Sequence, residues 1–274
     1  MPTETLHVLV VGAHPDDCDL KAGGIACKYA DRGHKVLFVS TTNGEAGHHE
    51  LAGRQLVERR HAEAEASAAV AGVEFEMFDV PDGRLRPSLE NRDRLVRRIR
   101  EFRPDLVLTH RPNDYHPDHR YTSRLVRDAA YLVAVPNVCP ATPALDRNPV
   151  FAYLSDTFER PYPFSPDVVV DIDDVAGRKF EMLDCHESQM YEWLPSVEGT
   201  LEAVPDDPDE RFEWLRGGGL PHVEVLADVS DRYRDALVER YGASGEDVRY
   251  AEAFEASEYG RALTDEAAER LFPF

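Results

Sequence analysis

Short apolar runs alternate with helical patterns through the first half of the chain, and this alternation constrains the fold more than any other feature. The strand-like runs lie at 6–11, 36–40, 73–78 and 105–109. The segments with apolar or alanine residues at helical spacing lie at 19–33, 54–72 and 89–102. Short apolar strands separated by helices of this length indicate βαβ units. We therefore predict an α/β fold, with a Rossmann-like, mostly parallel sheet covered by helices on both faces.

The chain becomes rich in proline after residue 135, and the regular alternation ends there. Later elements are expected as strands near 150–154 and at 167–172, a helix running to about His186, and helical stretches at 206–216 and 228–241. The segment "YAEAFE" (250–255) is expected to be an amphipathic turn. We predict one domain over 1–274, made of a core at 1–135 and helical or extended additions at 136–274.

Histidines and aspartates cluster just after two of the predicted strands. "AHPDD" (13–17) follows the first strand, and "HRPNDYHPDHR" (110–120) follows the strand at 105–109. Because ligands bind beyond the carboxyl ends of the strands in open parallel sheets, both clusters are expected at one edge. Removing such side chains from water costs free energy, and binding to a cation would compensate that cost. The pattern therefore favours a metal site.

The spacing within the clusters fits a catalytic metal, which uses three nitrogen or oxygen ligands and leaves one position open for water. His14 and Asp17 are three residues apart on one turn, close enough to bind one ion. The third ligand can come from His116 or His119, with the other histidine facing the substrate.

Three neighbouring residues are assigned other tasks. Asp16 is suited to act as a base on a metal-bound water, and Asp118 to anchor an imidazole. His110 is expected to end its strand in a structural hydrogen bond.

The paired motifs "AHPDD" and "HPDH" resemble those of the LmbE-like (PIG-L) superfamily of zinc-dependent N-deacetylases. Further matches extend over most of the chain: "NGEAG" (43–47), "RHAEAEASAAVAGV" (60–73), "CHESQ" (185–189) and "YAEAFE" (250–255). The resemblance implies a Rossmann-like domain that removes acetyl groups from N-acetylglucosaminyl compounds and related amides. The family motif commonly continues with a small residue and a glutamate, whereas this chain has Cys18 and Asp19.

The resemblance also implies roles for individual residues. The implied metal ligands are His14, Asp17 and His119. Asp16 becomes the general base, His116 stabilises the oxyanion or protonates the leaving amine, and Asp118 orients His116. Arg60 is expected either to contact the substrate or to pair with Glu63 on the same helix.

The predicted activity is therefore removal of an acetyl group from a small-molecule substrate, an N-acetylated sugar or sugar conjugate. Zn²⁺ is the expected cofactor, and a set of two histidines and one aspartate also suits Fe²⁺ or Mn²⁺. A metal-dependent esterase or amidase on another small acyl substrate stays open, as does a non-catalytic metal-binding protein. A dinucleotide-binding protein is disfavoured, because the first turn lacks G-x-G-x-x-G and its carboxylates would repel a pyrophosphate.

Charge and hydropathy limit the partners. The net charge of −21 argues against a nucleic acid or an anionic membrane as partner. No stretch approaches the roughly 18 apolar residues of a membrane helix, and no signal peptide is recognised, so a cytoplasmic location is expected. The four cysteines lack CxxC spacing, which predicts reduced thiols. The C-terminal additions and the resemblance are compatible with a homo-oligomer.

Overall fold

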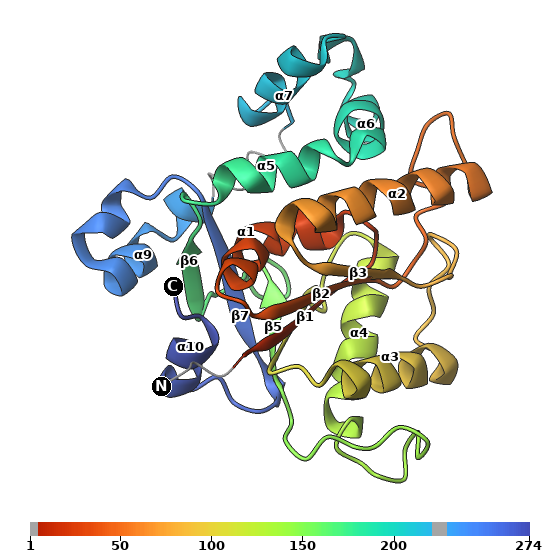
Figure 1. The fold of residues 1–274 in the computed structure, drawn as a ribbon, viewed down its shortest axis with the longest axis vertical. Helices are drawn as coiled ribbons and strands as arrows, with labels where there is room; N and C mark the ends of the chain where they lie inside the picture. Colours follow the sequence, from red (N-terminus) through yellow and green to blue (C-terminus); the bar gives the residue numbers. More distant parts are fainter. Residues whose placement is uncertain (1–4, 221–228) are drawn as a thin grey trace.

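The computed structural model describes residues 5–220 and 229–274, and within them seven strands form one sheet in the order β3-β2-β1-β4-β5-β7-β6 (Figure 1). The strands are β1 (His7–Gly12), β2 (Lys35–Ser40), β3 (Glu74–Met77), β4 (Leu106–Thr109), β5 (Val150–Leu154), β6 (Val168–Asp171) and β7 (Ala251–Gly260). Strands β1 to β5 pair in parallel, whereas β7 is antiparallel to both β5 and β6. The prediction of a mostly parallel α/β sheet is confirmed.

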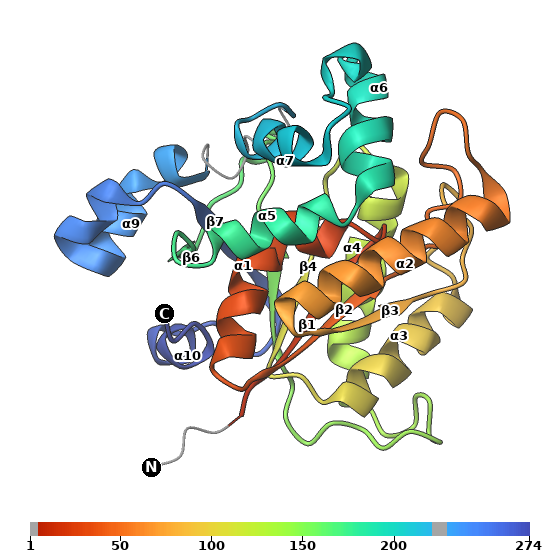
Figure 2. The same cartoon turned by 45° about the horizontal axis from the view of Figure 1, so that its top comes forward.

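Helices cover both faces of this sheet (Figures 1 and 2). One face carries α1 (Asp17–Asp31), α2 (Gly53–Ala71) and α5 (Ala176–Asp184), and the other carries α3 (Leu89–Phe102) and α4 (Pro117–Leu132). Further helices are η1 (Ser188–Trp193), α6 (Leu194–Glu198), η2 (Leu201–Ala203), α7 (Pro208–Arg216), α9 (Arg234–Tyr241), η3 (Gly242–Asp247) and α10 (Asp265–Leu271). In the described part of the chain, no helix has the length and apolar character needed to span a bilayer.

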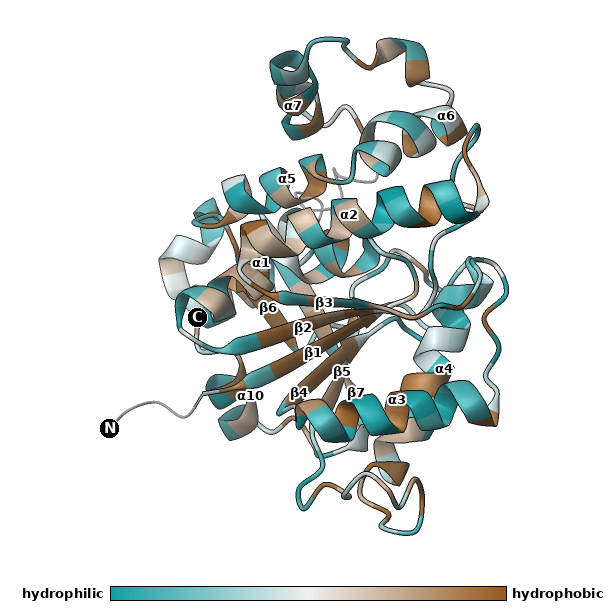
Figure 3. Ribbon diagram, turned by 45° about the vertical axis from the view of Figure 1, so that its right-hand side comes forward, coloured by the Kyte–Doolittle hydropathy of each residue, from teal (hydrophilic) through white to brown (hydrophobic). Residues whose placement is uncertain are grey.

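The two core layers follow from the side-chain alternation of the strands. In β1, Val8 and Val10 belong to the core beneath α1, whereas Leu9 and Val11 belong to the core beneath α3 and α4. Figure 3 shows the central strands as mostly hydrophobic, while the outer surfaces of α2 and α3 are mostly hydrophilic. A strand buried on both faces has no polar alternation, which is why these runs are continuously apolar.

One expectation for the C-terminal part differs from the structure. The segment "YAEAFE" is not a turn: its residues 251–255 form the first half of β7, whose register pairs Tyr153 with Glu255 and Val169 with Ala253. Its alanines and glutamates are strong helix formers, and burial between two strands overrides that preference. The expected helical stretch at 228–241 is largely confirmed: residue 228 lies outside the described residues, residues 229–232 are helical, and α9 follows after a turn at Tyr233.

Candidate metal centre

The two histidine and aspartate clusters meet at the carboxyl ends of β1 and β4, which are adjacent parallel strands. Crossover connections leave these two strands in opposite directions along the sheet, so a crevice opens between them. A cavity of about 610 Å³ lies there. Seven histidines and aspartates of the two clusters line it: His14, Asp16, Asp17, His110, Asp114, His116 and His119. The expected convergence is therefore present.

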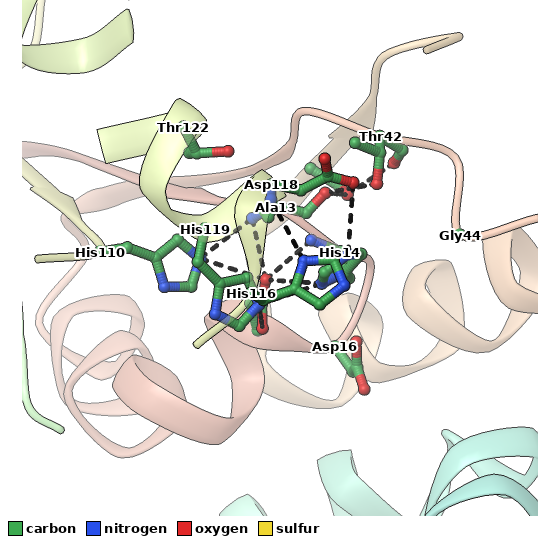
Figure 4. Close-up of polar contacts among 12 residues, drawn as sticks. Ala13, His14, Asp16, Thr42, Gly44, His110, His116, Asp118, His119 and Thr122 are labelled. Carbon is green, nitrogen blue, oxygen red and sulfur yellow. Dashed lines mark hydrogen bonds and ion pairs between the residues drawn. The ribbon is translucent and has the colours of Figure 1, made fainter. Parts of the chain in front are cut away.

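Three side chains come close enough to share one ion. His14 Nδ1 lies 3.1 Å from His119 Nε2 and 3.4 Å from Asp17 Oδ2, and His119 Nε2 lies 3.4 Å from Asp17 Oδ1. Two ligands bound tetrahedrally at about 2.1 Å lie about 3.4 Å apart. Figure 4 shows the imidazoles of His14, His116 and His119 lying next to one another. The spacing of the two nitrogens, each 3.4 Å from one oxygen of the Asp17 carboxylate, thus suits a divalent cation bound by all three side chains.

Asp17 is fixed by the backbone of the turn that precedes it. The N–H groups of Ala13 and His14 donate to Asp17 Oδ2 at 2.8 and 2.7 Å. A Cβ on Gly12 would lie 2.7 Å from the Asp17 Cβ, so this close approach requires glycine. Burial raises the pKa of Asp17, but the charges of His119 and His110 outweigh it and hold the pKa well below its usual range. The group is therefore a carboxylate, the form that binds metal.

The second ring nitrogen of His14 and that of His119 each face a carboxylate. His119 Nδ1 lies 3.1 Å from Asp114 Oδ1, and His14 Nε2 lies 3.3 Å from Asp82 Oδ1 and 3.8 Å from Asp118 Oδ2. Burial lowers the pKa of His14, but its hydrogen bonds with carboxylates, that of Asp118 first, raise it well above the usual value. Such carboxylate partners orient histidine ligands and increase their basicity.

His116 occupies a different position, at the N-cap of α4 just before Pro117. Its Nδ1 accepts the backbone N–H of Asp118 at 3.2 Å. Because Nδ1 accepts, the neutral ring carries its proton on Nε2. Burial and the charges of His14 and His119 lower the pKa of His116, which favours this neutral form.

The expectation that the Asp118 carboxylate orients His116 is wrong. Asp118 Oδ2 accepts the backbone N–H of Gly83 at 2.7 Å and faces His14 instead. Only the backbone of Asp118 contacts His116, because the first turn of α4 points its amides at the cap residue and its carboxylate elsewhere.

Arg60 binds Asp16 instead of its helix neighbour Glu63. Arg60 Nη2 lies 2.8 Å from Asp16 Oδ1, and Nη1 donates to the carbonyl of Gly44 at 3.2 Å. Glu63 pairs with Arg59, Nε to Oε1, at 3.0 Å, so the expected pair with Arg60 is wrong. Gly44 has φ +67°, and a Cβ there would lie 2.6 Å from Arg60 Nη1. Figure 4 shows Asp16 apart from the imidazoles.

His110 makes the structural hydrogen bond that the sequence predicts. The backbone N–H of Ala13 donates to His110 Nε2 at 3.1 Å, and this nitrogen lies 3.2 Å from Asp17 Oδ2. The ring stacks on His119 with centroids 4.1 Å apart. His110 therefore supports both the turn and one of the proposed ligands.

Two carboxylates that face the proposed ligands were not predicted from the sequence. Asp82 lies in "PDG" after β3, whose carboxyl end reaches the same edge of the sheet. This place after a strand was the one sequence feature that could have indicated a role for Asp82 in the site. Asn43 Oδ1 accepts the Asp82 N–H at 3.3 Å and so ties the "NGEAG" segment to it. Asp114 stood within the second cluster without a role. Its Oδ1 also accepts the N–H of His116 at 2.9 Å.

The "CHESQ" segment connects α2 to the loop after β2, and its Gln189 lines the cavity. The N–H of Ser188 donates to Glu63 at 2.9 Å, and the Gln189 amide donates to the carbonyl of Gly47 at 3.0 Å. Asp19, where the resemblance leads one to expect glutamate, accepts from Ser67 and lies 3.4 Å from His186 Nε2. The shorter acid therefore joins the "CHESQ" segment to α2 through His186 and Ser67.

Comparison with known proteins finds sequence similarity both to deacetylases and to a hydratase. The family model described as PIG-L, GlcNAc-PI de-N-acetylase, matches residues 9–130. A diacetylchitobiose deacetylase of Thermococcus kodakarensis is 33% identical over 195 residues, which cover 68% of this chain and 70% of that protein. A 4-oxalmesaconate hydratase of Pseudomonas putida is 28% identical over 201 residues, 70% of this chain and 78% of that protein.

A solved structure agrees with these sequence matches. The N,N'-diacetylchitobiose deacetylase from Pyrococcus horikoshii, complexed with its inhibitor, superposes with a TM-score of 0.69 and 27% identity. The match covers 93% of this chain and 84% of that one.

Proposed function

The chain belongs to the PIG-L family of de-N-acetylases, and from this premise we propose that it is a metal-dependent hydrolase releasing acetate from an N-acetylated sugar or sugar conjugate. The observation that carries the proposal is the approach of His14, Asp17 and His119 to within 3.4 Å of one another. Asp16 and His116 line the same cavity.

The donor chemistry fits a divalent cation held by His14, Asp17 and His119. One carboxylate and two imidazoles suit Zn²⁺ and also Fe²⁺ or Mn²⁺. The second nitrogens of both histidines are engaged by carboxylates, as in metal sites generally. When bound, the ion supplies Lewis acidity, polarising the acyl carbonyl and lowering the pKa of water toward ~7.

The chain's own residues would handle the protons. Asp16, anchored by Arg60, takes a proton from the attacking water as general base. His116, with its proton on Nε2, would donate a hydrogen bond to the negative charge that develops on the carbonyl oxygen of the acyl group. The proton held by Asp16 passes to the leaving nitrogen as the C–N bond breaks. The products are acetate and a free amine.

Water addition is a second candidate function. It is favoured by the similarity to the Pseudomonas putida hydratase, which spans 70% of this chain. A base that deprotonates water serves both reactions, because water is the nucleophile in each. In hydration the water adds across a carbon–carbon double bond and no acetate is released.

The test compares acetate release with hydration on the metal-loaded protein. N-acetylglucosamine, N,N'-diacetylchitobiose and an acetate ester are incubated with it, and acetate is quantified. Chelation should abolish release and Zn²⁺ or another divalent ion should restore it. A carboxylated diene is followed in parallel by its ultraviolet absorbance. Full acetate release after chelation, with metal removal confirmed by elemental analysis, overturns the metal-dependent mechanism. Hydration of the diene without any acetate release rejects the deacetylase function in favour of the hydratase function.

A further inference from the structure

One charged residue of the cavity lacks a partner, whereas the others are paired. Arg60 pairs with Asp16, and Arg111 pairs with Asp156 at 2.8 Å. Lys21 lines the same cavity, half-buried, and across residues 5–220 and 229–274 it makes neither an ion pair nor a hydrogen bond. An ammonium group in such a place has lost water without gaining a counter-ion, which is costly for the free protein.

The lining carboxylates are already engaged by other groups. Their partners are His14 for Asp82, His119 for Asp114, the turn amides for Asp17, and the two arginines for Asp16 and Asp156. Asp156 is the acid whose charge acts most on Lys21, yet no ion pair within 4.0 Å joins them. Burial is the larger influence and lowers the pKa of Lys21. The ammonium thus has its donors free toward the cavity.

The chain's other lysines behave differently. Lys28 pairs with Asp174 at 2.5 Å, Lys179 pairs with Glu252, and Lys35 is exposed. The chain has 27 arginines and these four lysines. A strongly hydrated lysine that enters a cavity unpaired is therefore exceptional in this protein.

The position of Lys21 relates it to the proposed metal ligands. It lies four residues after Asp17 on α1, so the two side chains emerge on the same side of the helix, about 6 Å apart along its axis. A substrate with its acetyl group at Asp17 can therefore extend another substituent toward the ammonium.

We propose that Lys21 binds an anionic group of the substrate, a carboxylate or a phosphate, one helical turn from the reacting centre. This rests on the proposed function only in taking the cavity as the substrate site. The substrate class is then an acidic N-acetylated sugar or conjugate, and a carboxylated compound if the reaction is hydration.

The test uses compounds that the deacetylase cannot hydrolyse. Titration calorimetry on the metal-loaded protein compares glucosamine with glucosamine 6-phosphate and with muramic acid, and glucose with glucose 6-phosphate. A charged hydrogen bond predicts that at least one acidic compound binds about tenfold to a hundredfold more tightly than its counterpart. The phosphate and carboxylate arms identify which anion the site prefers.

Variants of Lys21 decide the assignment. Lys21→Met should bring the ratio of affinities close to one, whereas Lys21→Arg should retain most of it. Asp156→Asn is the matched control, because it removes the carboxylate whose charge acts most on Lys21 without removing the ammonium, and should preserve the preference. A ratio near one in the unaltered protein, or a preference unchanged in Lys21→Met, overturns the proposal. If acidic compounds bind in a Lys21-dependent way but no acetate is released, the role of Lys21 stands and the deacetylase activity is rejected. If acetate is released but binding of acidic compounds does not depend on Lys21, the deacetylase activity stands and the role of Lys21 is rejected.

Discussion

Replacing Asp16 by asparagine tests the proposed base without touching the three proposed metal ligands. Asparagine keeps the shape of the side chain and an oxygen that can accept from Arg60 Nη2, now 2.8 Å from Asp16 Oδ1. Its amide cannot accept a proton from water. General-base catalysis contributes ~10²–10⁴ in rate, so kcat should fall by that factor, or about 2.7–5.5 kcal/mol in activation free energy.

The structural cost of the same change should be smaller. Arg60 is buried and would lose a charged partner, and stripping a buried ion pair costs about 3–5 kcal/mol. In Asp16→Asn, Arg60 Nη1 can still donate to the Gly44 carbonyl, and Asp82 Oδ2 lies 4.0 Å from the same nitrogen. We expect a loss of unfolding free energy below about 3 kcal/mol, because these partners and the asparagine oxygen remain.

The assay measures kcat by acetate release, metal content by elemental analysis and unfolding by urea titration. Asp146→Asn, at a side chain 93% exposed, makes the same chemical change far from the cavity and should leave all three unchanged. A metal-loaded Asp16→Asn protein with unaltered kcat would remove Asp16 from the mechanism.

Three further changes give separate readouts. Asp17→Ala should cost the protein its metal, measured as metal content after dialysis; full occupancy would exclude Asp17 as a ligand. Asp114→Asn removes the acceptor of His119 Nδ1 and should weaken metal affinity about 10–100-fold in a chelator competition; unchanged affinity would contradict the orienting role. Glu252→Gln leaves the buried Lys179 ammonium without its counter-charge and should cost about 3–5 kcal/mol in urea unfolding, partly recovered when both residues become methionine. A cost below about 1 kcal/mol would show that the pair is not effectively buried.

Sequence periodicity was sufficient for the core of the fold. Runs such as 105–109 are apolar because both sheet faces are covered, and their carboxyl ends locate the two clusters without any tertiary information. The strand β7 could not be found this way. "YAEAFEAS" has the composition of a helix, and only its neighbours β5 and β6 make it a strand.

The partners of the site residues were harder to predict than the residues themselves. The side chains of the "AHPDD" and "HPDH" motifs are fixed by local turns and an N-cap, so their positions follow from spacing. The carboxylates that face them come from elsewhere: Asp82 follows another strand, and Arg60 reaches Asp16 from α2. Such pairings depend on how loops approach one another, which one sequence does not encode in any short pattern.

The central claim is that His14, Asp17 and His119 hold one divalent ion at the carboxyl ends of β1 and β4. Its most direct measurement is an anomalous difference map from a crystal of the metal-loaded protein, collected at the absorption edge of the bound metal. We predict a single strong peak about 2.1 Å from His14 Nδ1, His119 Nε2 and an oxygen of Asp17, in the cavity that Asp16 and His116 also line. A peak coordinated by other residues in an active crystal, or none in a protein that retains full activity, would contradict the account.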